Sequence, residues 1–390
     1  METNKSKSSN ILSRRDFIRN VSLAAASAVA GNMAEKVHGS DKTTEKPNTP
    51  KILNYNPKMG YRRLGKTEMI ISEIGLGGHW KNRKGERYWN TFDNDEVPLD
   101  VVKNRTEVIR ACIDAGINYL DIGTSAECLA YGVVLKGRRD RMYISADDRN
   151  LCLRNEENCT VEKLMFDIDL CCRRLQTDYL DIWRVKADMY GKSTDVHIHA
   201  MLETFEKAHK AGKVRHLGIS SHRRPWLQQI IEKYPQIEMV SFPYTATTKR
   251  KWRPPGKDNA KEVNASFGSD NDQNIFQAIN KQDIGLVTIK PFLGGQLFKR
   301  KTKFPVKGRG SNKENRLALL TLQCILLNKA ITATIPGLST VHEVEIATRA
   351  SHTLRDGLTM ADMHWVMSQT NQQWATLPQE YCWLKDWQVV

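Results

Sequence analysis

The sequence predicts an α/β protein built as a (β/α)8 barrel. Short apolar runs typical of buried parallel strands alternate with helical patterns, and the repeat fills residues 58–350. That length is close to the roughly 250 residues usual for this fold, which often carries insertions. The eight strand-like runs are 71–75, 117–121, 142–146, 179–185, 214–219, 239–242, 285–289 and 333–335.

The segment after the third predicted strand has the sequence pattern of a helix. Thr160 can cap its first turn, and Glu162 places a negative charge near the positive end of the helix dipole. Apolar side chains then recur every three or four residues, which predicts one apolar face. These side chains are Val161, Leu164, Met165, Ile168, Cys172 and Leu175.

The segment before the barrel predicts an exported protein. The stretch "SRRDFIRN", residues 13–20, precedes a run of small apolar residues that ends in a small-x-small cleavage pattern at 28–30. This combination resembles a twin-arginine export signal, which implies the twin-arginine export machinery as a partner and a periplasmic or exported location. The run is too short to span a bilayer, so we expect no transmembrane segment. We assign residues 1–30 to the signal peptide and the polar residues 31–57 to a linker.

Composition narrows the class of partner. The formal net charge of +15 could attract polyanions, acidic substrates or a membrane surface. Part of the excess lies in the first 30 residues, and the interleaved basic and aromatic residues of a nucleic-acid-binding module are not found. We therefore expect a solvated basic surface and no specific nucleic-acid partner.

The cysteines and histidines do not predict a metal site. Eight cysteines and ten histidines lack the spacings of zinc ligands or of a disulfide framework. Most cysteines are expected to be buried thiols. Cys152 and Cys159 could pair in an oxidising compartment, and the spacing leaves that alternative open.

Polar residues at the ends of the predicted strands mark the candidate site, because sites in this fold lie on the loops after the carboxyl ends of the strands. The second strand ends at Asp121, the third is followed by Asp147, the fourth by Lys186 and the sixth by Tyr244. Two carboxylates and a lysine on neighbouring strands predict an acid–base cluster. Asp147 and Lys186 could equally form an ion pair with only a structural role.

Taken in order, these strands resemble the aldo-keto reductases. "MGYRRLGKTEMIISEIGLGG" resembles that family's opening hairpin and first strand, "INYLDIG" its second, "LKGRRDRMYIS" its third, "DYLDIWRVK" its fourth, "GKVRHLGISSH" its fifth and "ATIPGLST" its eighth. The resemblance covers nearly all of residues 58–350. It implies a hairpin before the barrel, a small-molecule carbonyl substrate, NADP or NAD as cofactor, and hydride transfer with a tyrosine as proton donor.

The catalytic residues implied by the resemblance are mostly replaced. The family's aspartate falls on Asp121, but its tyrosine falls on Ala126, its lysine on Asp147 and its histidine on Lys186. We expect the usual mechanism to fail here, because a carboxylate near the reacting carbonyl would oppose the developing alkoxide and no phenol is in place.

The cofactor positions implied by the resemblance are also altered. The residues after the fifth strand align with Ser220 and Ser221, and the position for the nicotinamide amide aligns with Ser241. Phosphate could still be held by the residues that open the last helix of the barrel and by the lysine after the seventh strand. These residues are Gly337, Ser339, Thr340 and Lys290.

Three functions remain open at this point. An oxidoreductase with a rearranged site would polarise a carbonyl with Lys186 and take a phenol from Tyr190 or Tyr244. A non-redox isomerase or lyase acting on a sugar derivative would use Asp121 or Asp147 as general base. A pseudoenzyme would bind a ligand or partner without turnover. The resemblance favours the oxidoreductase.

Two further segments are interpreted as structural. Tyr131 and Gly132 lie on the helix after the second strand, with Gly132 as a packing glycine. Residues 351–390 are predicted to be a helical extension with an aromatic tail, whose side chains could stack on sugar rings or pack against the barrel. The residues of interest there are Trp365, Trp374, Cys382, Trp383 and Trp387.

Overall fold

The computed structural model describes residues 52–78, 80, 92–147, 153–188, 191–246, 275–298 and 311–379. The chain divides into the units Met1–Thr49 and Pro50–Val390. The first unit, which contains the expected signal peptide and most of the linker, lies outside the described residues. The same is true of Cys152, Tyr190 and the aromatic tail from residue 380 onward.

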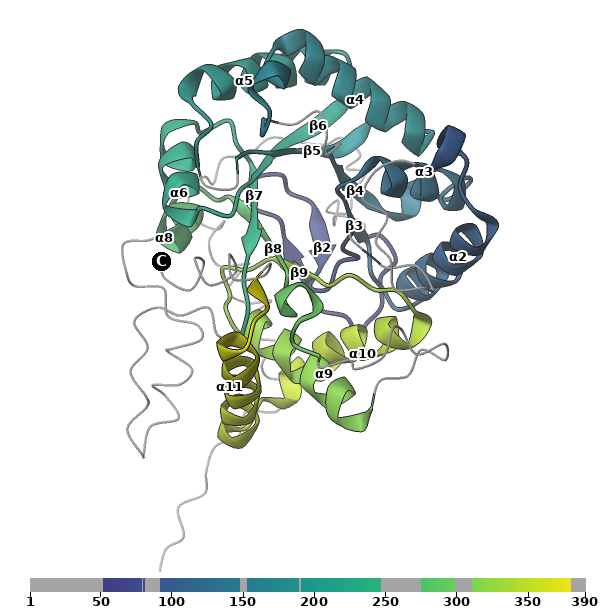
Figure 1. The fold of residues 1–390 in the computed structure, drawn as a ribbon, viewed down its shortest axis with the longest axis vertical. Coiled ribbons are helices and arrows are strands. Elements are labelled where there is room, and N and C mark those ends of the chain that lie inside the picture. Colours follow the sequence, from purple (N-terminus) through teal and green to yellow (C-terminus); the bar gives the residue numbers. More distant parts are fainter. Residues whose placement is uncertain are drawn as a thin grey trace, which may run out of the picture. The chain divides into compact units, whose positions relative to one another are not determined.

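Seven parallel strands form one sheet in the order β3 to β9, with helices around its outer face (Figure 1). They are β3 (Tyr119–Ile122), β4 (Tyr143–Ala146), β5 (Leu180–Lys186), β6 (Val214–Ser220), β7 (Met239–Pro243), β8 (Gly285–Ile289) and β9 (Ala333–Ile335). The register pairs Asp121 with Ser145 and Lys186 with Ser220, so the predicted site residues share one end of the sheet. The predicted fold class is confirmed.

Residues 74–77 supply the remaining barrel strand. Parallel bridges join Ile74 to Thr334, Leu76 to Leu120 and Gly77 to Gly337. The N–H of Leu76 donates to the carbonyl of Tyr119 at 2.8 Å, which ties the segment to β3. A Cβ at Gly77 would lie 2.7 Å from the carbonyl oxygen of Ile335, so glycine is required where this segment meets β9.

An antiparallel hairpin precedes that strand, formed by β1 (Tyr61–Arg63) and β2 (Ile70–Ser72). The predicted strand over 71–75 is therefore wrong in its bounds, because its first residues belong to the hairpin. The chain turns at Ser72, whose hydroxyl donates to the carbonyl of Ile74 at 2.6 Å and whose N–H donates to the side chain of Asn118 at 2.8 Å.

The end of the segment assigned to the linker is bound to the barrel. The side-chain amide of Asn54 donates to the carbonyl of Ile117 at 2.8 Å and to that of Arg141 at 2.7 Å. Residues 52–57 therefore lie against the amino end of the strands β3 and β4.

The barrel interior has an apolar layer and a polar layer. The apolar layer comprises Leu64, Met69, Ile71, Tyr119, Ile182, Met239, Val287, Ala333 and Ile335. Because side chains alternate along a strand, Asp121 follows Tyr119 on the inner face, and Arg184 follows Ile182. The carboxyl end of the barrel is consequently lined by buried polar groups.

The helices lie outside the strands. They are α2 (Leu99–Asp114), α3 (Ser125–Val134), α4 (Val161–Leu175), α5 (Asp195–Lys210), α6 (Arg224–Lys233), α8 (Ile275–Lys281), α9 (Asn312–Leu326), α10 (Val341–His352) and α11 (Met360–Ala375). Short 3-10 turns occupy Asp93–Asp95, Arg139–Arg141, Glu156–Asn158, Leu293–Gly295 and Leu354–Asp356. Helix α4 is capped by Thr160 as predicted, with its hydroxyl accepting the N–H of Lys163 at 3.3 Å. Its buried face also includes Asp167 and Cys171, which the apolar pattern did not identify.

The described part of the C-terminal extension contains α11, which packs against α9 (Figure 1). The guanidinium of Arg316 on α9 lies 4.8 Å from the ring centre of Trp365, and Trp374 is buried. Both tryptophans therefore serve packing between helices. Within the described ranges, no helix has the length and apolar character needed to cross a bilayer.

The described cysteines are buried free thiols: Cys112, Cys128, Cys159, Cys171, Cys172 and Cys324. Burial raises the pKa of Cys112, Cys172 and Cys324 to about 12. A thiol reacts as its thiolate, so these three should resist a thiol reagent in the native protein at pH 8 and react fully in guanidinium. Peptide mapping after brief labelling with a thiol-reactive disulfide reagent would check this. Rapid labelling of native Cys324 would contradict it.

Candidate active site

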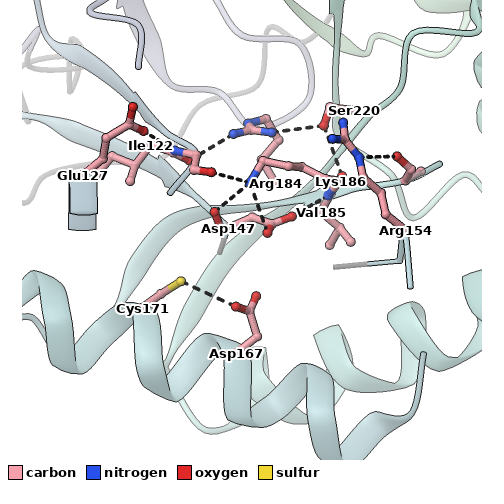
Figure 2. A network of polar contacts seen from close by, with 12 residues as sticks. Ile122, Glu127, Asp147, Arg154, Asp167, Cys171, Arg184, Val185, Lys186 and Ser220 are labelled. Atoms are coloured by element: carbon pink, nitrogen blue, oxygen red, sulfur yellow. Dashed lines mark hydrogen bonds and ion pairs between the residues drawn. The ribbon is translucent and has the colours of Figure 1, made fainter. Parts of the chain in front are cut away.

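Asp121 at the end of β3 is held by a guanidinium from β5. Arg184 donates from Nε to Asp121 Oδ1 at 2.7 Å and from Nη2 to Oδ2 at 3.3 Å. Nη2 also donates to the carbonyl of Ile122 at 3.0 Å, and Nη1 to the hydroxyl of Ser220 at 3.0 Å (Figure 2). Burial alone would lower the pKa of Arg184, but the charges of Asp121 and Asp147 outweigh it and raise the pKa.

A second buried ion pair lies beside the first. Lys186 Nζ is 3.4 Å from Asp147 Oδ1 and donates to the carbonyls of Asp147 at 2.9 Å and Gly123 at 3.0 Å. The backbone N–H of Lys186 also donates to the Asp147 carboxylate. Figure 2 shows Arg184 and Lys186 entering the network from the same strand, with Asp147 close to Lys186. The three ammonium protons of Lys186 are thus used within the protein.

All four charged side chains are largely buried, and they differ slightly in exposure. The Asp147 side chain is 1% exposed, whereas those of Asp121, Lys186 and Arg184 are 10%, 8% and 5% exposed. Asp147 is therefore a structural anion for Lys186. Asp121 is the most exposed of the four side chains, whereas Arg184 is less exposed than Lys186.

Asp121, Asp147 and Lys186 lie together as predicted, and Arg184, which was not among the predicted site residues, lies with them. The signal was present: residues two apart on a strand share a face, so Arg184 had to accompany Lys186 into the barrel. The remaining candidate, Tyr244, lies on another side of the barrel, after β7. Its ring contacts Phe276 edge-on at 5.9 Å and lies 6.0 Å from the guanidinium of Arg224.

The two tyrosine-related positions near Asp121 are both buried. Ala126, which aligns with the family's tyrosine, is fully buried in the core on α3. Tyr131 is also fully buried, and burial raises its pKa to about 12. Neither position presents a phenol to the barrel mouth, and the interpretation of Tyr131 as structural agrees with its surroundings.

The three serines predicted to bind a nicotinamide differ in their hydrogen-bond partners. Ser220 accepts from Arg184, and Ser221 donates to the carbonyl of Asp188 at 2.7 Å. Ser241 on β7 is 1% exposed, and its hydroxyl has no hydrogen-bond partner among the described residues. A buried hydroxyl without a partner is costly, so Ser241 suits a polar ligand group such as a carboxamide.

The loop predicted to hold phosphate is already occupied by the protein's own groups. Thr340 caps α10 by accepting the N–H of Glu343 at 3.2 Å, and the N–H of Ser339 donates to the Glu343 carboxylate at 2.7 Å. Gly337 pairs with Gly77 where the barrel closes. Lys290, at the end of β8, adopts a positive φ of 58°. In this structure the Ser339 N–H and the Thr340 hydroxyl are therefore both bonded to Glu343.

Comparison with known proteins identifies the family. Residues 89–356, more than half of the chain, match the sequence pattern of the aldo/keto reductase family. The chain belongs to the aldo/keto reductase family. It is 28% identical to the aldo-keto reductase YhdN of Bacillus subtilis over 173 residues, which are 42% of this chain and 47% of that protein. The match therefore spans about half the length of that relative.

One relative matches over a longer stretch of the chain, and two solved structures have a similar fold. L-galactose dehydrogenase of Arabidopsis thaliana is 24% identical over 316 residues, covering 74% of this chain and 86% of that protein. The aldo-keto reductase AKR11C1 of Bacillus halodurans superimposes with a TM-score of 0.53 at 21% identity, covering 80% of this chain and 96% of its own. An aldo/keto reductase of Klebsiella pneumoniae in complex with NADP and acetate gives 0.53 at 16% identity, covering 78% and 93%. At these identities the likeness establishes the fold.

Proposed function

We propose that this protein is an exported oxidoreductase that interconverts a carbonyl compound, such as a sugar derivative, and its alcohol. Membership of the aldo/keto reductase family supports the reaction class. The twin-arginine-like sequence at residues 13–20 supports export. The observation that carries the proposal is the polar layer at the carboxyl end of the barrel, where Asp121, Arg184 and Ser220 lie together above the apolar layer.

Arg184 is the best-placed group to polarise a substrate carbonyl. Lys186 donates its ammonium protons to Gly123 and Asp147. Arg184 donates to Asp121, Ile122 and Ser220, and these bonds leave one Nη1 proton that a substrate oxygen could accept. A fixed guanidinium stabilises developing negative charge on oxygen, because it is already oriented by its carboxylate partner. The role first assigned to Lys186 is therefore transferred to Arg184.

Ser220 is the candidate proton carrier in place of the missing phenol. Its hydroxyl accepts from Arg184 and points toward the carbonyl of Val185 at 3.4 Å, a long contact that is easily exchanged. It could pass its proton to a substrate alkoxide and recover one from solvent. A bound nicotinamide would supply or accept the hydride, with Ser241 available to hold its carboxamide.

Ser220→Ala is expected to lower kcat about a hundredfold, because it removes the proton carrier next to Arg184. Steady-state kinetics with a panel of sugar aldehydes and ketones would measure this. Ser193→Ala is the matched control, since Ser193 is also buried after β5 but hydrogen-bonds to the backbone of Asp188 and Leu153. An equal effect of both substitutions would exclude a specific role for Ser220.

One observation favours a second candidate, a protein without redox activity. The charges of Asp147 and Lys186 are fully engaged with each other and with backbone groups, as in a structural ion pair. Titration of the purified protein with NADPH and NADH, followed by nucleotide fluorescence and thermal shift, separates the two. Saturable binding supports the oxidoreductase. Absence of binding up to millimolar nucleotide would instead support a non-redox acid–base enzyme or a pseudoenzyme.

A further inference from the structure

A cavity of about 590 Å³ lies at the amino end of the barrel strands, away from the polar layer at their carboxyl end. Residues 52–55 form one side of it, Ile113 and Asp114 at the end of α2 form a second, and Asp140 and Arg141 before β4 form a third. Ligand pockets in proteins usually measure about 300–1,000 Å³, so this cavity is large enough to hold a small molecule.

The segment that forms one wall of the cavity is held in place by the barrel. Asn54 adopts a positive φ of 53°, which asparagine tolerates better than most residues. Its side-chain amide donates to the carbonyls of Ile117 at 2.8 Å and Arg141 at 2.7 Å, and the Tyr61 hydroxyl accepts the N–H of Asn56 at 2.8 Å. The wall is therefore preorganised, and a ligand would not have to order it.

Tyr55 gives this wall an aromatic surface. Its ring stacks on that of Tyr61, with the centroids 5.8 Å apart and the planes inclined by 26°, yet Tyr55 remains 65% exposed. A tyrosine held by a stacked neighbour can pack against a ligand with little further loss of side-chain entropy. The apolar face of a sugar ring is a suitable surface for such a contact.

The polar groups of the cavity favour a particular kind of ligand. Among the described residues, the carboxylates of Asp114 and Asp140 have no ion pair and no hydrogen bond. Arg141 donates from Nε to Asn54 Oδ1 at 2.7 Å, which leaves its two Nη groups for a ligand. Two carboxylates and one guanidinium leave an excess of negative charge, which disfavours an anion. Hydroxyl groups could donate to the carboxylates and accept from the guanidinium.

We infer that this cavity is a second binding site of the protein, for a neutral sugar with several free hydroxyl groups. A sugar bound here would lie at the opposite end of the strands from Asp121 and Arg184, so it would not occupy the candidate active site. The inference does not depend on the proposed oxidoreductase activity.

Methyl α-D-glucopyranoside is a suitable probe, because it offers a sugar ring with free hydroxyl groups and has no free carbonyl to be reduced. We expect the full-length protein to bind it saturably in saturation-transfer difference NMR. Tyr55→Ala should weaken binding about fivefold, which corresponds to the loss of one aromatic stacking contact. The matched control is Phe166→Ala, since Phe166 on α4 is 53% exposed and lies outside the cavity. It should change the affinity by less than about twofold.

The acidic analogue methyl α-D-glucopyranosiduronate tests the charge of the cavity. It should bind about fivefold more weakly than the neutral glycoside, and Asp140→Asn should reduce this difference. Three results would each overturn the inference: no saturable binding of the neutral glycoside up to about 100 mM, equal affinities of the wild type and Tyr55→Ala, or equal binding of the two glycosides. None of them would affect the nucleotide titration that tests the proposed function.

Discussion

Replacing Arg184 with methionine is expected to lower the free energy of unfolding by about 3–5 kcal/mol. The substitution leaves the buried Asp121 carboxylate without the guanidinium that donates to both of its oxygens. Removing one partner of a buried pair is costly because the remaining charge is neither solvated nor neutralised. Equilibrium unfolding in urea, followed by tryptophan fluorescence, would measure the loss.

Two controls separate the buried charge from lost packing. The double variant Asp121→Leu with Arg184→Met removes both charges and should be more stable than Arg184→Met alone. Lys207→Ala breaks a pair with Glu203 in which both side chains are 56% exposed, and should cost less than about 1 kcal/mol. The single variant Asp121→Leu completes the comparison: if its loss and that of Arg184→Met simply added in the double variant, the two charges would not be coupled.

Gly132→Ala is expected to destabilise the protein by about 3 kcal/mol. A Cβ at this position would overlap the backbone carbonyl of Arg174, so α3 and α4 could not keep their present distance. Helix propensity alone predicts the opposite sign, because alanine is favoured over glycine inside a helix by about 1 kcal/mol. Thermal and urea unfolding would decide between the two effects.

The neighbouring exposed residue supplies the comparison for Gly132. Val133 is 39% exposed on the same helix, and Val133→Ala should change stability by less than about 1 kcal/mol. A Gly132→Ala protein as stable as the wild type would show that α3 and α4 can separate without cost. The interpretation of Gly132 as a packing glycine would then fail.

The sequence predicts those parts of the site for which the position of a residue on its strand determines where its side chain lies. Asp121, Asp147 and Lys186 each follow an apolar run, and parallel strands bring their carboxyl ends together, so their convergence was foreseeable. Arg184 was foreseeable by the same rule and was overlooked because it lies inside a strand rather than after it. The pairing of Asp121 with Arg184 rather than with Lys186 was not foreseeable, because it depends on side-chain reach across the barrel.

The start of α10 shows a different kind of limit. The segment from Thr340 to Glu343 has the spacing of a capping box, and the same residues also suit a phosphate site. Both uses compete for the same backbone N–H groups. In the structure Glu343 accepts the N–H of Ser339, and Arg105, a residue more than two hundred positions earlier in the chain, holds the carbonyls of the same loop.

The contact between residues 74–77 and β9, which closes the barrel, limits how early during synthesis the protein can fold. Gly77 and Gly337 are bridged directly, although one is made early in synthesis and the other late. A growing chain that has not yet emerged from the ribosome as far as Gly337 has no partner for its first barrel strand, so the ring of strands cannot close during most of translation. Closure of the barrel therefore has to wait until nearly the whole of its sequence has been synthesised.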